Sequence, residues 1–144
     1  KTIILAKLNK KIPIYGKGTN IRDWIHVDDH CNGVLIAFLK GKSGESYNIS
    51  KNNEINNLVI VKKILELMNK SEDLIEFVED RPGHDFRYSM SSEKISKELG
   101  WKSKVDFEKG IQDTINWYED HEDYWKDTPS SVFNPTPWKN LKKT

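Results

Sequence analysis

Asp80-Arg81-Pro82-Gly83-His84-Asp85-Phe86-Arg87-Tyr88 is the stretch around which the rest of the sequence can be organised. Its Pro-Gly pair predicts a tight bend, because proline presets φ and glycine accepts positive φ. Charged and hydrogen-bonding side chains on either side of the bend can then converge on one point. A guanidinium close to an imidazole suits phosphate oxygens, but a surface turn with salt-bridged arginines explains these residues alone equally well.

Regular elements are expected on both sides of this stretch. The apolar run Ile75 to Val78 leads into it and is typical of a short strand. Beyond it, Ser91 or Ser92 can cap a helix that ends at Leu99-Gly100. Far upstream, Ile12 to Tyr15 reads as a second short extended segment at a sheet edge.

Apolar spacing decides most of the remaining elements. It predicts helices at about residues 1–10, 28–41, 58–68 and 107–118, and strands at 21–27 and 44–49. In the second helix the expected buried stripe consists of Cys31, Val34, Leu35 and Phe38. Strands that alternate with helices indicate an α/β or α+β fold.

The bulk composition excludes several classes of function. At 144 residues the chain fits one domain, and its net charge of +1 gives no field that favours nucleic acid or a membrane surface. No apolar run is long enough to span a membrane, and no signal peptide is visible. The single cysteine, Cys31, allows no disulfide framework and favours a reducing compartment such as the cytoplasm.

The two ends of the sequence differ from a standard domain. A helical pattern is already present at Lys1, without a methionine or a capping signal before it. We therefore expect the sequence to be the C-terminal piece of a longer chain. Residues 126–144 have no periodicity, and we expect an irregular tail that is pinned by Trp125, Phe133 and Trp138.

Few residues have a spacing that suggests catalysis. His26, His30 and Cys31 lack a fourth ligand at a sensible spacing, so no metal site is expected. Cys31 is expected to be a packing residue rather than a nucleophile. Gly16-Lys17-Gly18 does not lie in a strand–turn–helix unit that would bind a dinucleotide.

What remains is a dispersed set of anion-binding and amide groups, Arg22, Asn57, Arg81 and His84. Two arginines can neutralise a diphosphate, and each charge-assisted hydrogen bond contributes about 1.5–3 kcal/mol. Asn56 or Asn57 is the natural N-cap of the helix at 58–68, although the same position could present an amide to an anion. The set indicates binding chemistry without complete catalytic machinery.

Read in order, several segments resemble the dTDP-glucose 4,6-dehydratases of the extended short-chain dehydrogenase/reductase family. They are Pro13-Ile14-Tyr15-Gly16-Lys17-Gly18, Asn20-Ile21-Arg22-Asp23-Trp24, Val27-Asp28-Asp29-His30, Gly44 to Ile49, Asn53 to Leu58 and, most distinctively, Asp80 to Asp85 with Arg87-Tyr88. Further matches up to Trp117-Tyr118 extend the resemblance over about residues 1–125. Related epimerases and decarboxylases share the Arg-Asp region in a looser form.

The resemblance implies an α/β fold in which this chain is the C-terminal, nucleotide-sugar-binding part of the enzyme. The missing N-terminal Rossmann half would bind NAD and carry the catalytic residues, so the piece alone would be inactive. In that family a hydride leaves C4 of the glucose, water is eliminated across C5–C6, and the hydride returns to C6. The substrate would be a dTDP- or UDP-sugar, and the intact enzyme would be a homodimer.

The resemblance also implies a set of substrate-binding residues and no catalytic, cofactor-binding or metal-binding residue in this chain. The set is Pro13, Ile14, Tyr15, Arg22, Asn57, Asp80, Arg81, Pro82, Gly83 and His84. The segment 13–15 would line the nucleotide pocket, the two arginines would contact the diphosphate or the nucleotide, and Asn57 and His84 would form hydrogen bonds beside them. Asp85, Arg87 and Tyr88 would brace the turn.

Three departures from the family pattern and two alternatives accompany this interpretation. The last twenty residues follow no family pattern. Ser50-Lys51 stands where the family often has Gly-Gly, and Tyr88-Ser89-Met90-Ser91 where it has Tyr-Ala-Ile/Met-Asp. A non-catalytic homologue, or a sister epimerase or decarboxylase, is an alternative.

In relatives the segment 21–49 packs against the N-terminal half, so the piece alone should expose apolar surface around Val34, Leu35 and Phe38 and tend to aggregate.

Overall fold

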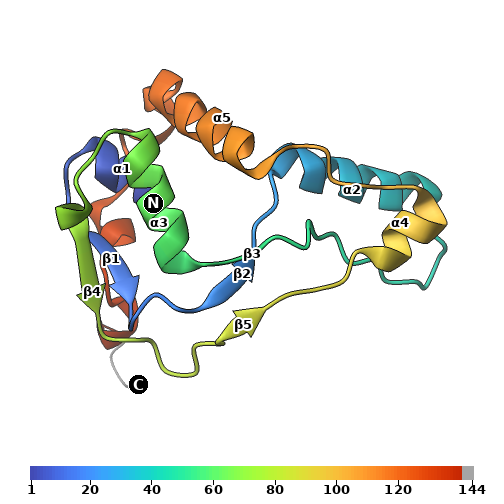
Figure 1. Cartoon of the computed structure of the whole chain (residues 1–144), viewed down its shortest axis with the longest axis horizontal. Coiled ribbons are helices and arrows are strands. Elements are labelled where there is room, and N and C mark those ends of the chain that lie inside the picture. The colour runs from blue at the N-terminus through green and yellow to red at the C-terminus, as the bar shows by residue number, and fades with distance from the viewer. Residues whose placement is uncertain (141–144) are drawn as a thin grey trace.

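The computed structural model describes residues 1–140. Its helices are α1 (Thr2–Lys7), α2 (Val27–Lys40), α3 (Asn57–Leu67), α4 (Glu93–Leu99), α5 (Phe107–Asp120) and α6 (Glu122–Trp125). Its strands are β1 (Ile12–Tyr15), β2 (Ile21–Asp23), β3 (Glu54–Asn56), β4 (Ile75–Val78) and β5 (Arg87–Tyr88). Short 3₁₀ turns are η1 (Glu72–Leu74), η2 (Ser130–Phe133) and η3 (Pro137–Asn140). Figure 1 shows one lobe around α1, α3, β1 and β4, and a second around α2 and α4.

Two small sheets are linked by two neighbouring stretches of chain. β1 pairs with β4 in parallel, and β2 lies between antiparallel β3 and parallel β5. Residues 16–20 connect β1 to β2, and residues 79–86 connect β4 to β5. Because both pairs are parallel, the two connections leave the first sheet at the same end and reach the second sheet at the same end (Figure 1). We call residues 79–86, which contain the Pro-Gly bend, the second crossing.

The packed lobe, which comprises α1, β1, α3, β4 and α5, contains most of the hydrophobic core. Its first cluster consists of Leu5, Ala6, Ile12, Ile14, Val61 and Leu65, and its second of Ile3, Ile60, Ile64 and Ile115. α3 contributes to both clusters, since Val61 and Leu65 form one row along the helix and Ile60 and Ile64 form the next row. The predicted core side of the helix at 58–68 is therefore confirmed, as are the predicted strands at 12–15 and 75–78.

The second lobe, which we call the α2 arm, comprises α2, residues 41–53 and α4. Its core consists of Ile95, Leu99 and Trp101, against which Ile25, Ile36, Ala37, Tyr47 and Ile49 pack. α2 meets Ile49 at Gly33, where a Cβ would lie 2.8 Å from the Cγ2 atom of Ile49. The helix therefore packs within this chain through the face of Gly33, Ile36 and Ala37, and the lack of a side chain at Gly33 allows the close approach of Ile49.

The other face of α2 is open. The predicted burial of Cys31, Val34, Leu35 and Phe38 is wrong for this chain, because all four residues are exposed and Phe38 is 83% exposed. The companion expectation, that this part of the chain exposes apolar surface, is confirmed. Helical periodicity predicted correctly that α2 has an apolar face. Within the described residues, however, α2 packs through the face that contains Gly33.

Two predicted strands also differ from the structure. The strand expected at 21–27 ends at Asp23, because α2 begins at Val27 and is capped by His26, whose Nδ1 accepts a hydrogen bond from the Asp28 N–H at 3.3 Å. The segment 44–49 is not a strand. Its Tyr47 and Ile49 side chains pack on the core of the arm, but no strand within residues 1–140 pairs with its backbone, and a strand needs such a ladder.

The tail returns to the packed lobe in short helical turns, and its three predicted anchors are confirmed. Trp125 is buried, Phe133 packs against the first core cluster, and Trp138 packs against Tyr15. The helices at 93–99 and 107–120 also match expectation, with Gly100 in the left-handed conformation and Asp106 as the N-cap of the latter. Across residues 1–140, none of the helices combines the length and the apolar character needed to cross a membrane.

Candidate functional site

The carboxyl end of the first sheet brings three predicted site residues together. Tyr15 ends β1, and its ring packs edge-on against the imidazole of His84, with the two centroids 6.0 Å apart. Nδ1 of His84 lies 2.6 Å from Oδ1 of Asp80. The His84 side chain is only 6% exposed. The second crossing is therefore folded so that an imidazole is fixed between β1 and a carboxylate.

Asp80 determines how His84 can act. The hydrogen bond with His84, reinforced by the backbone N–H of Arg81 at 2.9 Å, holds the pKa of Asp80 below its ordinary value. An ionised carboxylate only accepts hydrogen bonds, so Nδ1 of His84 carries the proton and Nε2 is the nitrogen left for a ligand. Gly16, at φ 55°, permits this approach, because a Cβ there would lie 3.0 Å from Oδ2 of Asp80.

Arg22 joins the second sheet to the second crossing. Its Nη1 donates to the carbonyl of Ile21 at 2.6 Å and its Nη2 to the carbonyl of Asp85 at 2.9 Å. The guanidinium carbon also lies 5.5 Å from the centre of the Tyr88 ring, within the range of a cation–π contact. These contacts use part of its five N–H donors and fix its plane.

Asn57 is linked to the second crossing through Asn20, which was not among the predicted site residues. The N–H of Asn57 donates to the carbonyl of Asn20 at 3.0 Å, and Nδ2 of Asn20 donates to the carbonyl of Asp85 at 3.1 Å. Asn20 is buried. Its place in the Asn-Ile-Arg-Asp segment was visible, but only the three-dimensional pairing of the two crossings reveals its role.

The N-terminus of α3 does not offer its backbone to an anion. The N–H groups of Asn57 and Leu58 donate to the carbonyls of Asn20 and Gly18, both at 3.0 Å, and the N–H of Val59 donates to Oδ1 of Asn56 at 2.9 Å. Asn56 is thus the N-cap, one of the two predicted candidates. The side-chain amide of Asn57 is the group left for a ligand.

The two arginines of the 80–88 stretch have different environments. Arg87 forms a bidentate ion pair with Glu54, with nitrogen–oxygen distances of 2.8 and 2.7 Å. Within the described part of the chain, the exposed guanidinium of Arg81 has no carboxylate partner. The interpretation as a salt-bridged surface turn therefore fits Arg87, whereas Arg81 remains available to an anionic ligand.

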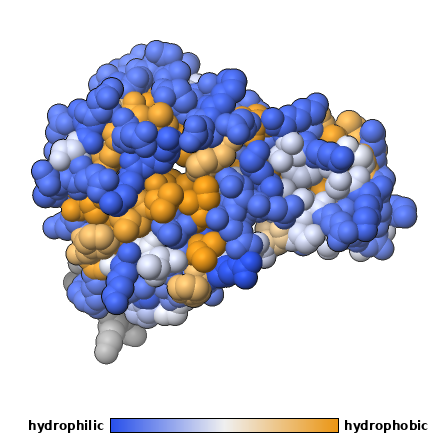
Figure 2. Space-filling view, in the orientation of Figure 1, coloured by the Kyte–Doolittle hydropathy of each residue, from blue (hydrophilic) through white to orange (hydrophobic). Residues whose placement is uncertain are grey.

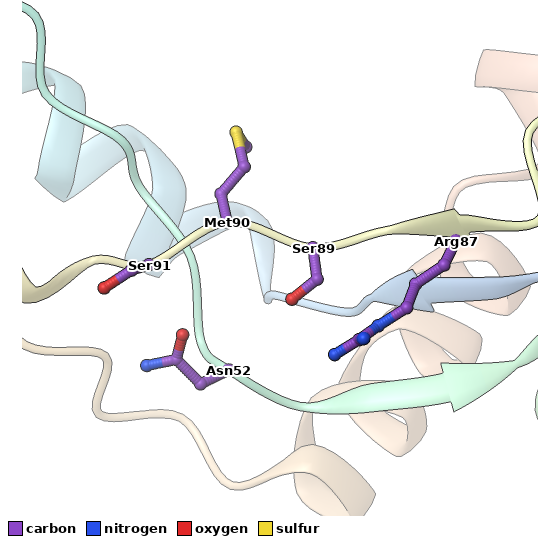
Figure 3. Close-up of a pocket in the computed structure, with 5 residues that line it drawn as sticks. All are labelled: Asn52, Arg87, Ser89, Met90 and Ser91. Atoms are coloured by element: carbon purple, nitrogen blue, oxygen red, sulfur yellow. The ribbon is translucent and has the colours of Figure 1, made fainter.

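A shallow polar pocket of about 390 Å³ lies beside the Arg87–Glu54 pair. In Figure 3 Arg87 and Ser89 point toward the side where Asn52 lies, whereas Met90 points away. The Ser89 hydroxyl also donates to Oε1 of Glu54, at 2.6 Å. The hydrogen bonds from Arg87 and Ser89 hold the pKa of Glu54 below its ordinary value. These polar groups already satisfy one another, so they connect β3 to β5 rather than await a ligand.

The remaining predicted residues occupy the strand and the bend. Ile14 is buried in the first core cluster, and Pro13 and Tyr15 flank it on the alternate face of β1. Pro82 and Gly83 are exposed, and Gly83 has φ 65°, as the predicted bend requires. Ile14 therefore places its side chain in the core, and its contribution to a pocket would come from its backbone.

An apolar groove of about 760 Å³ opens between the packed lobe, including α5, and the start of α2. Its walls include Trp24, Phe107, Ile111, Trp117 and Tyr118. Figure 2 shows apolar surface gathered over the packed lobe on the visible face. Among residues 1–140, no group of three or more His, Cys, Asp or Glu side chains is arranged to hold a metal ion.

Known proteins resemble this chain in sequence and in fold. The sequence profile of the family described as GDP-mannose 4,6 dehydratase matches residues 1–114. The chain belongs to this family. A probable dTDP-glucose 4,6-dehydratase of Sinorhizobium fredii is 39% identical over 140 residues, which cover 92% of this chain and 40% of that protein. The dTDP-glucose 4,6-dehydratase of Haemophilus influenzae is 44% identical over 124 residues, covering 78% of this chain and 37% of its own length.

Solved structures agree with the sequence relatives. The dTDP-glucose 4,6-dehydratase of Bacillus anthracis, solved in complex with NAD, superposes with a TM-score of 0.82 at 45% identity, covering 87% of this chain and 40% of that one. This chain thus spans about 40% of the length of the relatives that it matches. The resemblance to the C-terminal part of the dTDP-glucose 4,6-dehydratases and the α/β fold class are both confirmed.

Proposed function

We propose that this chain is the nucleotide-sugar-binding, C-terminal part of an NAD-dependent 4,6-dehydratase that acts on dTDP-glucose or UDP-glucose. The observation that carries the proposal is the arrangement of the second crossing. It holds His84 through Asp80, leaves the Arg81 guanidinium without a carboxylate partner among residues 1–140, and receives Arg22 at the Asp85 carbonyl. A diphosphate needs such a set of fixed cations and hydrogen-bond donors.

Each site residue has a role that follows from its surroundings. Arg22, with its plane fixed, and Arg81, on the exposed bend, would neutralise the diphosphate. Nε2 of His84, the unprotonated nitrogen of this tautomer, would accept a hydrogen bond from a hydroxyl or N–H group of the nucleotide, and the side-chain amide of Asn57 would donate one to the nucleotide or the phosphate. Asp80 would act indirectly, because it sets the tautomer and the orientation of His84.

The hydride chemistry would belong to another part of the protein. The Gly16-Lys17-Gly18 turn follows β1 but leads into β2 rather than into a helix, so the described residues form no dinucleotide cradle. We propose that an N-terminal Rossmann half holds NAD and supplies the catalytic acid, base and hydride-accepting site. That half would also cover the open face of α2. The intact protein would be a homodimer in the cytoplasm.

The experiment that tests the proposal uses the full-length protein that contains this chain. Purified protein with NAD is incubated with dTDP-glucose or UDP-glucose, and the product is identified by mass spectrometry and NMR. We expect a 4-keto-6-deoxyhexose nucleotide, and a loss of at least tenfold in substrate affinity for Arg81→Ala, because a charge-assisted contact contributes about 1.5–3 kcal/mol. Lys102→Ala, which removes an exposed cation beyond α4, is the matched control.

The outcomes separate the alternatives. Nucleotide binding without any turnover would favour a non-catalytic homologue. An epimerised or decarboxylated product would favour a sister enzyme. Failure to bind either nucleotide sugar would overturn the proposal.

A further inference from the structure

The C-terminal tail returns to the candidate nucleotide site. Its course is fixed at several points: Phe133 packs on the first core cluster, and Nζ of Lys1 donates to the carbonyl of Asn134 at 3.1 Å. Lys139 then pairs with Glu79, with Nζ 2.5 Å from Oε2. Figure 1 shows the described part of the tail running beside β1 and reaching the carboxyl end of β4, where the second crossing begins.

Between these anchors, Trp138 contacts the site itself. Its indole packs edge-on against the ring of Tyr15, with centroids 5.2 Å apart and planes inclined at 67°. Tyr15 in turn contacts His84. Both Tyr15 and Trp138 are partly exposed, so ring surface remains accessible beside the imidazole. An inclined pair of aromatic rings of this kind presents a face to a planar ligand group.

We propose that Trp138 forms the aromatic wall against which the base of the bound nucleotide stacks. The inference rests on the proposed function, since it assigns one end of the same site. Aromatic side chains bind bases through their faces and tolerate different bases, because every base has a π-face. The phosphates would lie toward Arg22 and Arg81, and the base toward Tyr15 and Trp138. The Lys139–Glu79 pair would act as a positioning contact for the indole.

The experiment measures nucleotide binding by the full-length protein in calorimetric titrations with TDP, UDP and inorganic pyrophosphate. Trp138→Ala should weaken TDP and UDP binding about tenfold, as the loss of one stacking partner does, and should leave pyrophosphate binding unchanged. Trp138→Phe, which keeps a ring, should recover most of the loss. Tyr124→Ala removes an exposed ring elsewhere in the C-terminal region and serves as the matched control.

Each result decides the question. Unchanged TDP binding in Trp138→Ala would overturn the role of Trp138 while the proposed function stands. An equal loss of TDP and pyrophosphate would show that the indole only supports the fold of the crossing, and would also overturn it. Absence of all binding in the wild-type protein would instead refute the proposed function.

The positioning role of the ion pair has its own test. Lys139→Glu and Glu79→Lys should each weaken TDP binding a few-fold, and the double exchange should restore it, because the pair is re-formed with reversed charge. Additive losses in the double variant would contradict the role of the pair.

Discussion

The packed lobe and the α2 arm each contain a helix with an apolar face, α3 and α2, but only the apolar face of α3 is covered. In α3 the apolar residues Ile60, Val61, Ile64 and Leu65 are all buried, whereas in α2 the only buried residues are Asp29 and Gly33. The difference does not come from the helices themselves, since both have an apolar face and a side-chain cap. It comes from whether an opposing layer exists within the described residues. An amphipathic pattern therefore states that a face needs a partner, and does not state where the partner lies.

The candidate site lies on and next to the packed lobe, the lobe in which the apolar helix face is covered. Tyr15, His84 and Asp80 are attached to the first sheet of the packed lobe, while Arg22 and Asn57 belong to β2 and α3 next to it. The second sheet connects these residues to the arm (Figure 1). The contrast predicts that the site keeps its geometry when the arm is perturbed, and loses it when the packed lobe is perturbed.

The largest expected effect distinguishes the core of the packed lobe from the open face of α2. Leu65→Ala, at a fully buried position of the packed lobe, should lower the free energy of unfolding by about 3 kcal/mol, because it removes buried methyl groups and leaves a cavity. Phe38→Ala, on the open face of α2, should change it by less than about 0.5 kcal/mol. Urea unfolding of the 144-residue chain, followed by circular dichroism, measures both. Similar losses for the two variants would remove the distinction between the lobes.

The second prediction concerns self-association of the same chain. Val34, Leu35, Phe38 and Leu39 leave a continuous apolar strip on α2, and exposed strips of this kind promote association. We expect concentration-dependent association in analytical ultracentrifugation, which Leu35→Glu with Phe38→Glu should abolish. Val132→Glu, at an exposed position in the tail, is the control and should not change it. A sharply melting monomer in the unmodified chain would contradict the prediction.

The parts of the fold that were predictable depend on local signals. β1, β4 and the helices from α3 to α5 follow from short-range patterns and caps, as at Asn56 and Gly100. The segment 44–49 has a strand-like pattern, but a strand also requires a neighbour, and within residues 1–140 none pairs with it. The burial of α2 failed for the same reason, since burial depends on residues distant in sequence.

The site shows the same limit. The residue types of Arg22, Arg81 and His84 indicated the chemistry of these side chains. They did not indicate which polar side chains would be left for a ligand and which would hold the fold together. Asp80 is paired with His84 and Arg87 with Glu54, over separations of 4 and 33 residues. Trp138 was predicted to pin the tail, but its contact with Tyr15 spans most of the chain and follows no periodic signal.

The smallest expected effect lies at the connection between the two lobes, where Glu54 of β3 is paired with Arg87 of β5. Because Arg87 and Ser89 hold the pKa of Glu54 below its ordinary value of 4.5, the pair stabilises the fold above that pH and stops doing so as the pH falls through the lowered value. Glu54→Gln should therefore be less stable than the unmodified chain at pH 7, and the difference should disappear as the pH falls through the lowered pKa of Glu54 and the unmodified carboxyl is protonated.

Urea unfolding at pH 7, 5 and 3 measures this difference, and added salt should reduce it, because the pair is largely exposed. Amide hydrogen exchange locates it: faster exchange in Glu54→Gln should appear at residues 87–91, while the amides of α3 in the packed lobe stay protected. If α3 loses protection to the same extent, the two lobes unfold as one unit and the sheet between them is part of a single core. If protection changes only around β5, the pair connects two regions of separate stability, as the difference in their burial requires.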